Sequence, residues 1–129
     1  MAGTGSGQQS VTGFANGDDT NSLFVVENAF GAAACARGAV VKCGDVVRLQ
    51  HLNTKNRLHS HLHASPLSNQ QEVSAYGHTN NDDNWQIVCI EKKDKVWKRE
   101  AKVRLLHATT QKYLSSNARH KFSNPIPGN

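Results

Sequence analysis

An internal repeat is the feature that most restricts what this sequence can fold into. The segment 47–60 reads VRLQHLNTKNRLHS and aligns without gaps on 103–116, VRLLHATTQKYLSS, where seven of fourteen positions are identical. A second pair, 6–26 and 68–88, shares five of twenty-one positions, and further positions match as apolar residues. Two pairs of matching segments indicate that one supersecondary unit is repeated along the chain.

The matching segments divide the chain into units. Residues 38–93 form one complete unit, residues 6–26 the end of a preceding unit, and residues 101–129 the start of a following one. Residues 1–5 precede the first match and are expected to be a tag-like or disordered start. We expect the two half-units to complement each other, within one chain or by self-association of two chains, because strand edges would otherwise be exposed.

Four short strands are predicted within the complete unit. Each run alternates apolar and polar residues or is bounded by turns rich in Asn, Asp or Pro, and no run of ten residues has helical spacing. Repeated four-stranded units are typical of β-propellers and β-trefoils, but two propeller blades would not close, so an all-β β-trefoil is predicted. The predicted strands are 45–51, 57–61, 71–76 and 85–89.

Apolar residues of these strands are expected to form the core. Trp85 is the largest of them, and truncating it to Ala should cost about 3–5 kcal/mol if it is buried. In the preceding unit the ungapped alignment places Leu23 where the complete unit has this tryptophan. The other predicted core residues are Val47, Leu49, Leu58, Val73, Ile87, Val103, Leu105 and Leu114.

The net charge of +5 is unevenly distributed. Residues 1–91 hold five Lys or Arg against eight Asp or Glu, whereas residues 92–129 hold ten against two. A basic segment of this kind is typical either of a surface for an anionic ligand or of an ordinary solvated face. Both interpretations stay open at this point.

Three histidines stand at alternate positions in RLHSHLH, so His59, His61 and His63 share one face of a strand. They would form a metal site only if further ligands came from elsewhere, for which His51, His78 and His107 are candidates. The later unit has Ser115-Ser116 where the complete unit has His59-Ser60, which favours a structural role for the row. We therefore predict no metal site.

No catalytic motif or cofactor motif is found. The cysteines lack a Cys-His signature, there is no G-x-S-x-G sequence, and no glycine-rich loop opens a helix. Asp82 and Asp83 lie in an Asn-rich turn, where carboxylates cap backbone amides. The sequence therefore predicts a protein that is not an enzyme and has no cofactor.

Successive motifs in the complete unit resemble the MIR motif: GDVVRLQH at 44–51, LHSH at 58–61, QEVSAY at 71–76 and NWQI at 84–87. This motif is shared by protein O-mannosyltransferases, inositol trisphosphate and ryanodine receptors, and the stromal cell-derived factor 2 family. GQQSVTG at 7–13 and SPLSNQQEVSAYG at 65–77 make the resemblance closest to the last of these.

The resemblance implies a β-trefoil of three MIR repeats, of which this sequence holds one complete repeat and two halves. It implies a non-catalytic factor of the endoplasmic reticulum lumen, associated with lumenal chaperones and with unfolded or mannosylated proteins. Neither nucleic acid binding nor direct membrane insertion is expected. The alternative is a regulatory MIR segment of a larger membrane protein, an O-mannosyltransferase or a calcium-release channel.

Polar residues around the LHSH hairpin are the candidate ligand-binding site. They offer planar donors and amides to a sugar hydroxyl or a carboxylate, or else they hold the hairpin itself together. The candidates are Arg57, His59, Ser60, His61, Gln70 and Gln71.

Three cysteines allow one intrachain disulfide. A trefoil unit pairs its first and fourth strands, which brings the start of the first strand near the end of the fourth. We therefore predict a Cys43–Cys89 disulfide, with Cys35–Cys89 as the alternative.

Overall fold

The computed structural model describes residues 6–13, 19–116 and 119. Within them the regular structure consists of strands and two short 3₁₀ turns, which confirms the all-β prediction. The elements are β1 (Gln9–Ser10), η1 (Thr20–Ser22), β2 (Phe24–Asn28), β3 (Val46–His51), β4 (Arg57–Ala64), β5 (Gln71–Tyr76), η2 (Asn81–Asp83), β6 (Trp85–Cys89), β7 (Val103–His107) and β8 (Lys112–Tyr113).

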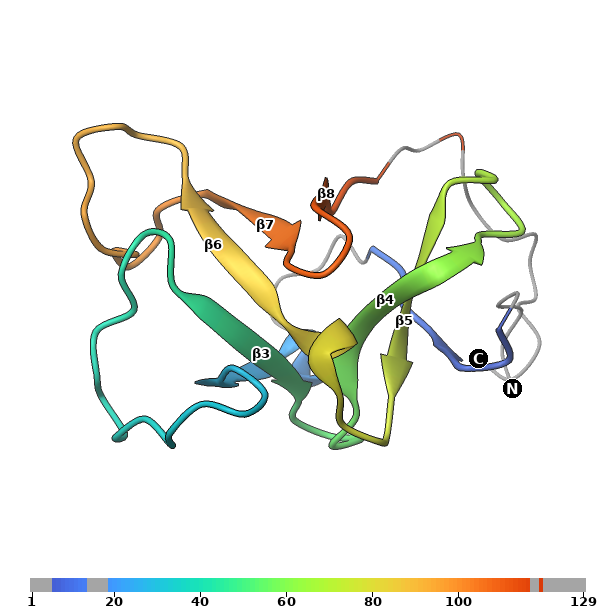
Figure 1. Cartoon of the computed structure of the whole chain (residues 1–129), viewed down its shortest axis with the longest axis horizontal. Coiled ribbons are helices and arrows are strands. Elements are labelled where there is room, and N and C mark those ends of the chain that lie inside the picture. The colour runs from blue at the N-terminus through green and yellow to red at the C-terminus, as the bar shows by residue number, and fades with distance from the viewer. Residues whose placement is uncertain (1–5, 14–18, 117–118, 120–129) are drawn as a thin grey trace.

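All the strands belong to one antiparallel sheet with β3 at its centre (Figure 1). Neighbouring strands follow the order β1-β5-β4-β3-β6-β7-β8, and β2 also pairs with β3. The longest hairpin is β4–β5, which extends away from the loop that joins β6 to β7 (Figure 1). This arrangement separates a polar hairpin on one side of the molecule from a basic loop on the other.

The four strands predicted for the complete unit are all present. Three match their predicted bounds within one residue, because alternating burial follows the alternating sequence: Val47 and Leu49 are buried on β3, Trp85 and Ile87 on β6. Strand β4 continues to Ala64 instead of ending at residue 61, because its pairing with β5 resumes beyond an irregularity.

The core lies where β3, β4 and β6 meet. Trp85 is 1% exposed, and its indole Nε1 donates a hydrogen bond to the Leu58 carbonyl over 3.1 Å. Leu114 is an exception to the predicted core, since it is 39% exposed. It follows β8, a short strand that pairs only with β7 in the described part of the chain, so no further strand covers it there. The buried apolar cluster consists of Val47, Leu49, Leu58, Trp85 and Ile87, with Val73, Val103 and Leu105 packed against it.

The strand registers correct the alignment of the preceding unit. In β2–β3, Phe24 pairs with His51, and in β6–β7, Trp85 pairs with His107. The rings also meet in both pairs, at centroid distances of 5.2 and 4.8 Å. Phe24, and not Leu23, therefore holds the position equivalent to the tryptophan. The ungapped alignment was wrong by one residue because it cannot represent a length difference in the connection that precedes β2.

A His-x-x-Thr turn follows both β3 and β7. After β3, the ring of His51 places Nδ1 2.8 Å from the Thr54 hydroxyl and Nε2 2.6 Å from a carbonyl of η1. After β7, His107 makes the same contacts, 2.7 Å to the Thr110 hydroxyl and 2.8 Å to a carbonyl of η2. Each turn is thus tied to the 3₁₀ turn that precedes the neighbouring strand. The unit boundaries stay a prediction, and residues 1–5 and most of 117–129 lie outside the described residues.

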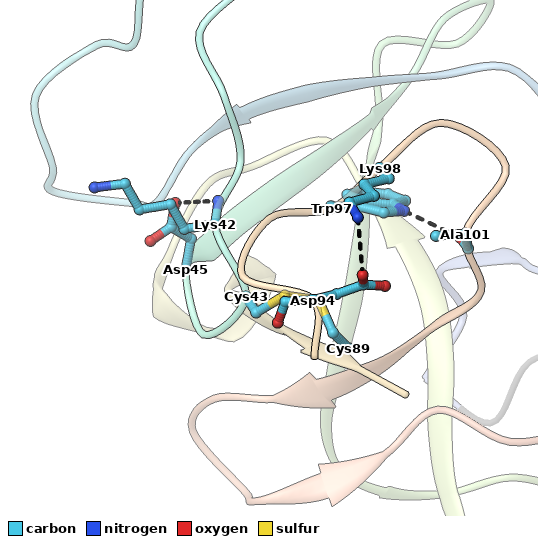
Figure 2. The surroundings of a disulfide bond; sticks show 8 residues. All are labelled: Lys42, Cys43, Asp45, Cys89, Asp94, Trp97, Lys98 and Ala101. Carbon is cyan, nitrogen blue, oxygen red and sulfur yellow. Dashed lines mark hydrogen bonds and ion pairs between the residues drawn. A yellow bond between two sulfur atoms is a disulfide. The ribbon is translucent and has the colours of Figure 1, made fainter. Parts of the chain in front are cut away.

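The Cys43–Cys89 disulfide is confirmed, with Cα atoms 5.6 Å apart, and the Cys35–Cys89 alternative is wrong (Figure 2). The pairing of β3 with β6 brings these cysteines together: Val46 faces Gln86, and Gly44 donates to the Ile87 carbonyl over 2.7 Å. Cys35 is an exposed free thiol.

Candidate functional site

The β4 strand carries most of the predicted site residues on its two faces. Arg57, His59 and His61 alternate along one face, and each of them meets a carboxylate from a different element: Glu27 of β2, Asp83 of η2 and Glu72 of β5. These three pairs therefore join β4 to three separate parts of the fold.

Arg57 forms a two-point ion pair with Glu27. Its Nε lies 2.7 Å from Oε1 and its Nη2 3.2 Å from Oε2, the forked geometry that suits guanidinium and carboxylate. The hydrogen bonds that Arg57 donates to Glu27 raise the pKa of Arg57 above its usual value. The donors that were predicted to meet a ligand are thus engaged by a carboxylate of the same chain.

His59 is buried and hydrogen bonded to a buried carboxylate. Its Nδ1 lies 2.8 Å from Asp83 Oδ1, with the residues 2% and 0% exposed. The other oxygen of Asp83 accepts the Asn80 amide over 3.1 Å, and Asn80 in return accepts the Asp82 amide. This capping box confirms that the acidic pair lies in a turn whose polar side chains cap backbone amides.

The three histidines of β4 belong to a longer row of rings. Successive centroid distances are 5.1 Å from His63 to His61, 5.0 Å from His61 to His59, 4.8 Å from His59 to Tyr76 and 5.3 Å from Tyr76 to His78. Contacts at these spacings are typical of packed aromatic side chains. The row runs from the exposed end of the hairpin into the buried pair at His59.

His61 is the member of this row with a buried ring nitrogen that has no hydrogen-bond partner in the described residues. Its Nε2 is buried and lies 3.6 Å from Glu72 Oε1, a separation too long for a hydrogen bond but close enough for charge attraction. Glu72 also accepts a hydrogen bond from the Ser6 hydroxyl. Burial lowers the pKa of His61 below its usual value, and the neighbouring charges of His59 and His63 lower it further, against the opposing effect of Glu72.

Ser60 lies on the other face of β4, where its hydroxyl is hydrogen bonded to the Gln71 side chain of β5. The Ser60 hydroxyl donates to the Glu72 carbonyl over 2.7 Å and accepts the Gln71 amide over 2.7 Å. The same amide donates to the Thr110 hydroxyl over 2.9 Å, so the hairpin is joined to the β7–β8 turn. The Gln71 Oε1 is buried and has no hydrogen-bond partner within the described residues.

Gln70 lies apart from these networks, at the exposed turn of the β4–β5 hairpin. The backbone carbonyl of Gln70 accepts the Ser65 backbone N–H over 2.7 Å, and the backbone N–H of Gln70 donates to the Ser68 hydroxyl over 3.2 Å. Asn69 adopts a left-handed conformation with φ of 61°, which Asn tolerates better than most residues. The Gln70 side chain is free to face solvent.

The structure thus brings together five of the six predicted residues, but in two networks on opposite faces of β4. Sequence reasoning missed their partners Glu27, Glu72 and Thr110, which come from other strands and turns. The sequence did contain a signal for Thr110: in the alignment of 103–116 on 47–60, Thr110 is identical to Thr54.

The described residues of this site offer hydrogen-bond donors, hydrogen-bond acceptors and packed rings. No group of three or more His, Cys, Asp or Glu side chains in the described part of the chain is positioned to hold a metal ion. Among those residues, no helix is long and apolar enough to cross a membrane.

Comparison with known proteins agrees with this picture. A family model described as MIR domain matches residues 2–124. A stromal cell-derived factor 2-like protein of Dictyostelium discoideum is 48% identical over 130 residues, which cover 98% of this chain and 60% of that protein. Human stromal cell-derived factor 2 is 42% identical over 129 residues, with 98% and 59% covered. The chain therefore spans about 60% of the length of these curated relatives.

Two solved structures have a similar fold. The crystal structure of an SDF2-like protein from Arabidopsis thaliana matches with a TM-score of 0.82 and 44% identity, covering 89% of this chain and 64% of that one. A protein O-mannosyltransferase complex of S. cerevisiae bound to the sugar donor matches with a TM-score of 0.65 and 31% identity, covering 78% of this chain and 15% of that one.

The all-β antiparallel sheet, together with the match to the MIR domain model, places this protein among the β-trefoil-like domains. Within that class, the chain belongs to the MIR domain family, and over most of its length it is similar to stromal cell-derived factor 2.

Proposed function

We propose that this chain acts as a non-catalytic quality-control factor that associates with chaperones in the lumen of the endoplasmic reticulum. The observation that carries the proposal is its 42–48% identity to proteins named for stromal cell-derived factor 2. The Cys43–Cys89 disulfide supports the compartment, because such bonds persist in oxidising environments and are rare in the cytosol.

In this proposal the β4–β5 hairpin contacts glycans or unfolded clients. Of the predicted site residues on this hairpin, Gln70 is exposed, and the His61 side chain is 21% exposed although its Nε2 is buried. Leu62, beside His61, is 85% exposed. His59 and Ser60 are buried, so they hold the hairpin in place and do not meet the ligand. A protruding apolar side chain between polar neighbours suits contact with an exposed apolar segment of an unfolded chain.

The test combines capture and direct binding. The chain, with its disulfide intact, is incubated with lumenal extract of the endoplasmic reticulum, and captured proteins are identified by mass spectrometry. Binding to mannose-containing glycans and to a carboxymethylated, permanently unfolded protein is measured in parallel. We expect lumenal chaperones among the captured proteins and binding of at least one probe; the loss of both results would overturn the proposal.

Matched variants test the hairpin. His61→Ala with Gln70→Ala should weaken probe binding, whereas His78→Ala with Gln86→Ala, the same residue types outside the hairpin tip, should leave it unchanged. Equal effects of the two double variants would exclude the hairpin as the contact surface.

A second candidate function is a regulatory MIR segment of a larger membrane protein. The similarity to part of the O-mannosyltransferase complex favours it, since this chain covers 15% of that structure. The full-length transcript separates the two candidates, because several long apolar segments indicate the membrane protein and a short lumenal retention signal indicates the chaperone-associated factor.

A further inference from the structure

The connection between β6 and β7, residues 90–102, is basic: it contains six Lys or Arg against three acidic residues, the first of which is Glu91. Residues 92–102, here called the basic loop, contain six Lys or Arg against the two acidic residues Asp94 and Glu100, a net charge of +4. All six basic side chains are exposed, and within the described part of the chain only Lys98 forms an ion pair, 3.1 Å from Asp94. The six are Lys92, Lys93, Lys95, Lys98, Arg99 and Lys102.

The backbone of the basic loop is fixed to the body of the domain. The Cys43 amide donates to the Lys95 carbonyl over 3.0 Å, and the Trp97 amide donates to the Val41 carbonyl over 2.8 Å. Trp97 packs against the core, and its indole Nε1 donates to the Ala101 carbonyl over 3.3 Å (Figure 2). The disulfide to Cys89 lies directly beneath the loop (Figure 2).

A cationic surface held in this way differs from an ordinary solvated charge run. Its backbone is already ordered, so a partner that binds it does not lose affinity to the ordering of the loop. Its charges are almost all uncompensated, so they produce a local positive potential that attracts an extended anionic partner.

The loop fits an acidic polypeptide better than other polyanions. Single-stranded nucleic acids bind proteins through exposed aromatic side chains that stack on bases, but Trp97 is half-buried and its N–H is engaged. Membrane-binding segments combine basic residues with apolar side chains that insert, but Val96 and Trp97 are both half-buried. Apart from the carboxylate of Glu100, the exposed charged groups of the loop are five amines and one guanidinium, which suit carboxylates spaced along a chain.

We propose that the basic loop is a docking surface for an acidic segment of a partner polypeptide. The choice of a polypeptide over nucleic acid also rests on the proposed lumenal function. The loop lies on the opposite side of the molecule from the tip of the β4–β5 hairpin (Figure 1), so the two surfaces are able to bind different partners at once.

The test measures binding of a fluorescent decaglutamate peptide to the full chain by anisotropy. We expect saturable binding that weakens steeply between low and physiological salt, since exposed charges are screened. Lys92→Gln, Lys93→Gln and Lys95→Gln together should weaken binding about tenfold, because three of the six cations are removed.

The matched control is Arg37→Gln with Lys55→Gln and Lys112→Gln, which removes the same charge from exposed positions outside the loop. We expect less than a threefold effect. Equal weakening by the two triple variants would assign binding to net charge and overturn the proposal. So would tighter binding of single-stranded DNA or of vesicles rich in phosphatidylserine through the same three lysines.

Chaperone capture by the unmodified chain keeps the two proposals distinct. If chaperones are captured but decaglutamate does not bind, only the docking surface fails. If decaglutamate binds through the loop but no lumenal chaperone is captured and neither the glycans nor the unfolded protein bind, only the proposed function fails.

Discussion

Removing the carboxylate of Asp83 should destabilise the fold far more than removing that of its neighbour Asp82. Asp83 is fully buried and serves two donors, the ring of His59 at 2.8 Å and the Asn80 amide at 3.1 Å. The Asp82 side chain makes no hydrogen bond or ion pair within the described residues, although its backbone does. The pair Asp83→Ala and Asp82→Ala therefore compares the same chemical change in two adjacent positions.

The magnitude follows from the groups left behind. In Asp83→Ala, the His59 ring keeps a buried donor without an acceptor, which costs about 1–3 kcal/mol. Loss of the cap on the Asn80 amide adds about 1 kcal/mol. The expected decrease in the free energy of unfolding is therefore about 2–4 kcal/mol, a large part of the stability of a small domain. For Asp82→Ala we expect a change within about 0.5 kcal/mol, as at other surface positions.

Urea unfolding at neutral pH without reductant measures both changes, with Trp85 and Trp97 as fluorescent probes and the slope checked for two-state behaviour. A double-mutant cycle that combines Asp83→Ala with His59→Ala tests the interaction between these two side chains. Once His59 is gone, Asp83→Ala should cost a different amount, with a coupling energy of at least about 0.5 kcal/mol, because the two residues act as one unit. Equal stabilities of Asp83→Ala and Asp82→Ala would refute the reasoning.

Three further changes test other parts of the fold. Trp85→Ala should lower the free energy of unfolding by about 3–5 kcal/mol in urea titrations, since a fully buried ring leaves a cavity. Replacing Cys43 and Cys89 with Ser should cost about 4 kcal/mol for a closed loop of this length, whereas Cys35→Ser should leave the urea midpoint unchanged. Because the pKa of His61 is lowered in the fold, the unfolded chain binds more protons, so stability should fall as pH drops below about 6.5, and His61→Gln should flatten that fall in urea midpoints measured from pH 7.5 to 5.

The strands and most of the core were predictable because they depend on local pattern. Alternation in the sequence placed β3, β5 and β6 almost to the residue, and the expected pairing of first and fourth strands led to the Cys43–Cys89 bond. The prediction that Leu114 is a core residue was wrong, because its burial depends on a covering strand, which no pattern within its own segment reveals.

The site was predictable only in part. The strand period correctly placed His59 and His61 on one face, but it gave no information on what lies opposite that face. The carboxylates that face Arg57, His59 and His61 come from residues 27, 83 and 72, and only the tertiary arrangement brings these to β4. Groups predicted as ligand contacts are therefore largely engaged within the chain.

The His-x-x-Thr turns fix the protons on two imidazole rings. In both His51 and His107, Nε2 faces a backbone carbonyl, which accepts only, so Nε2 carries the hydrogen and Nδ1 accepts from the threonine hydroxyl. At His107 the Thr110 hydroxyl also accepts the Gln71 side-chain amide, and its own hydrogen is available to donate to the ring Nδ1. Both rings are therefore the same neutral tautomer, and their ¹⁵N resonances should show the same pattern although one ring is partly exposed and the other buried.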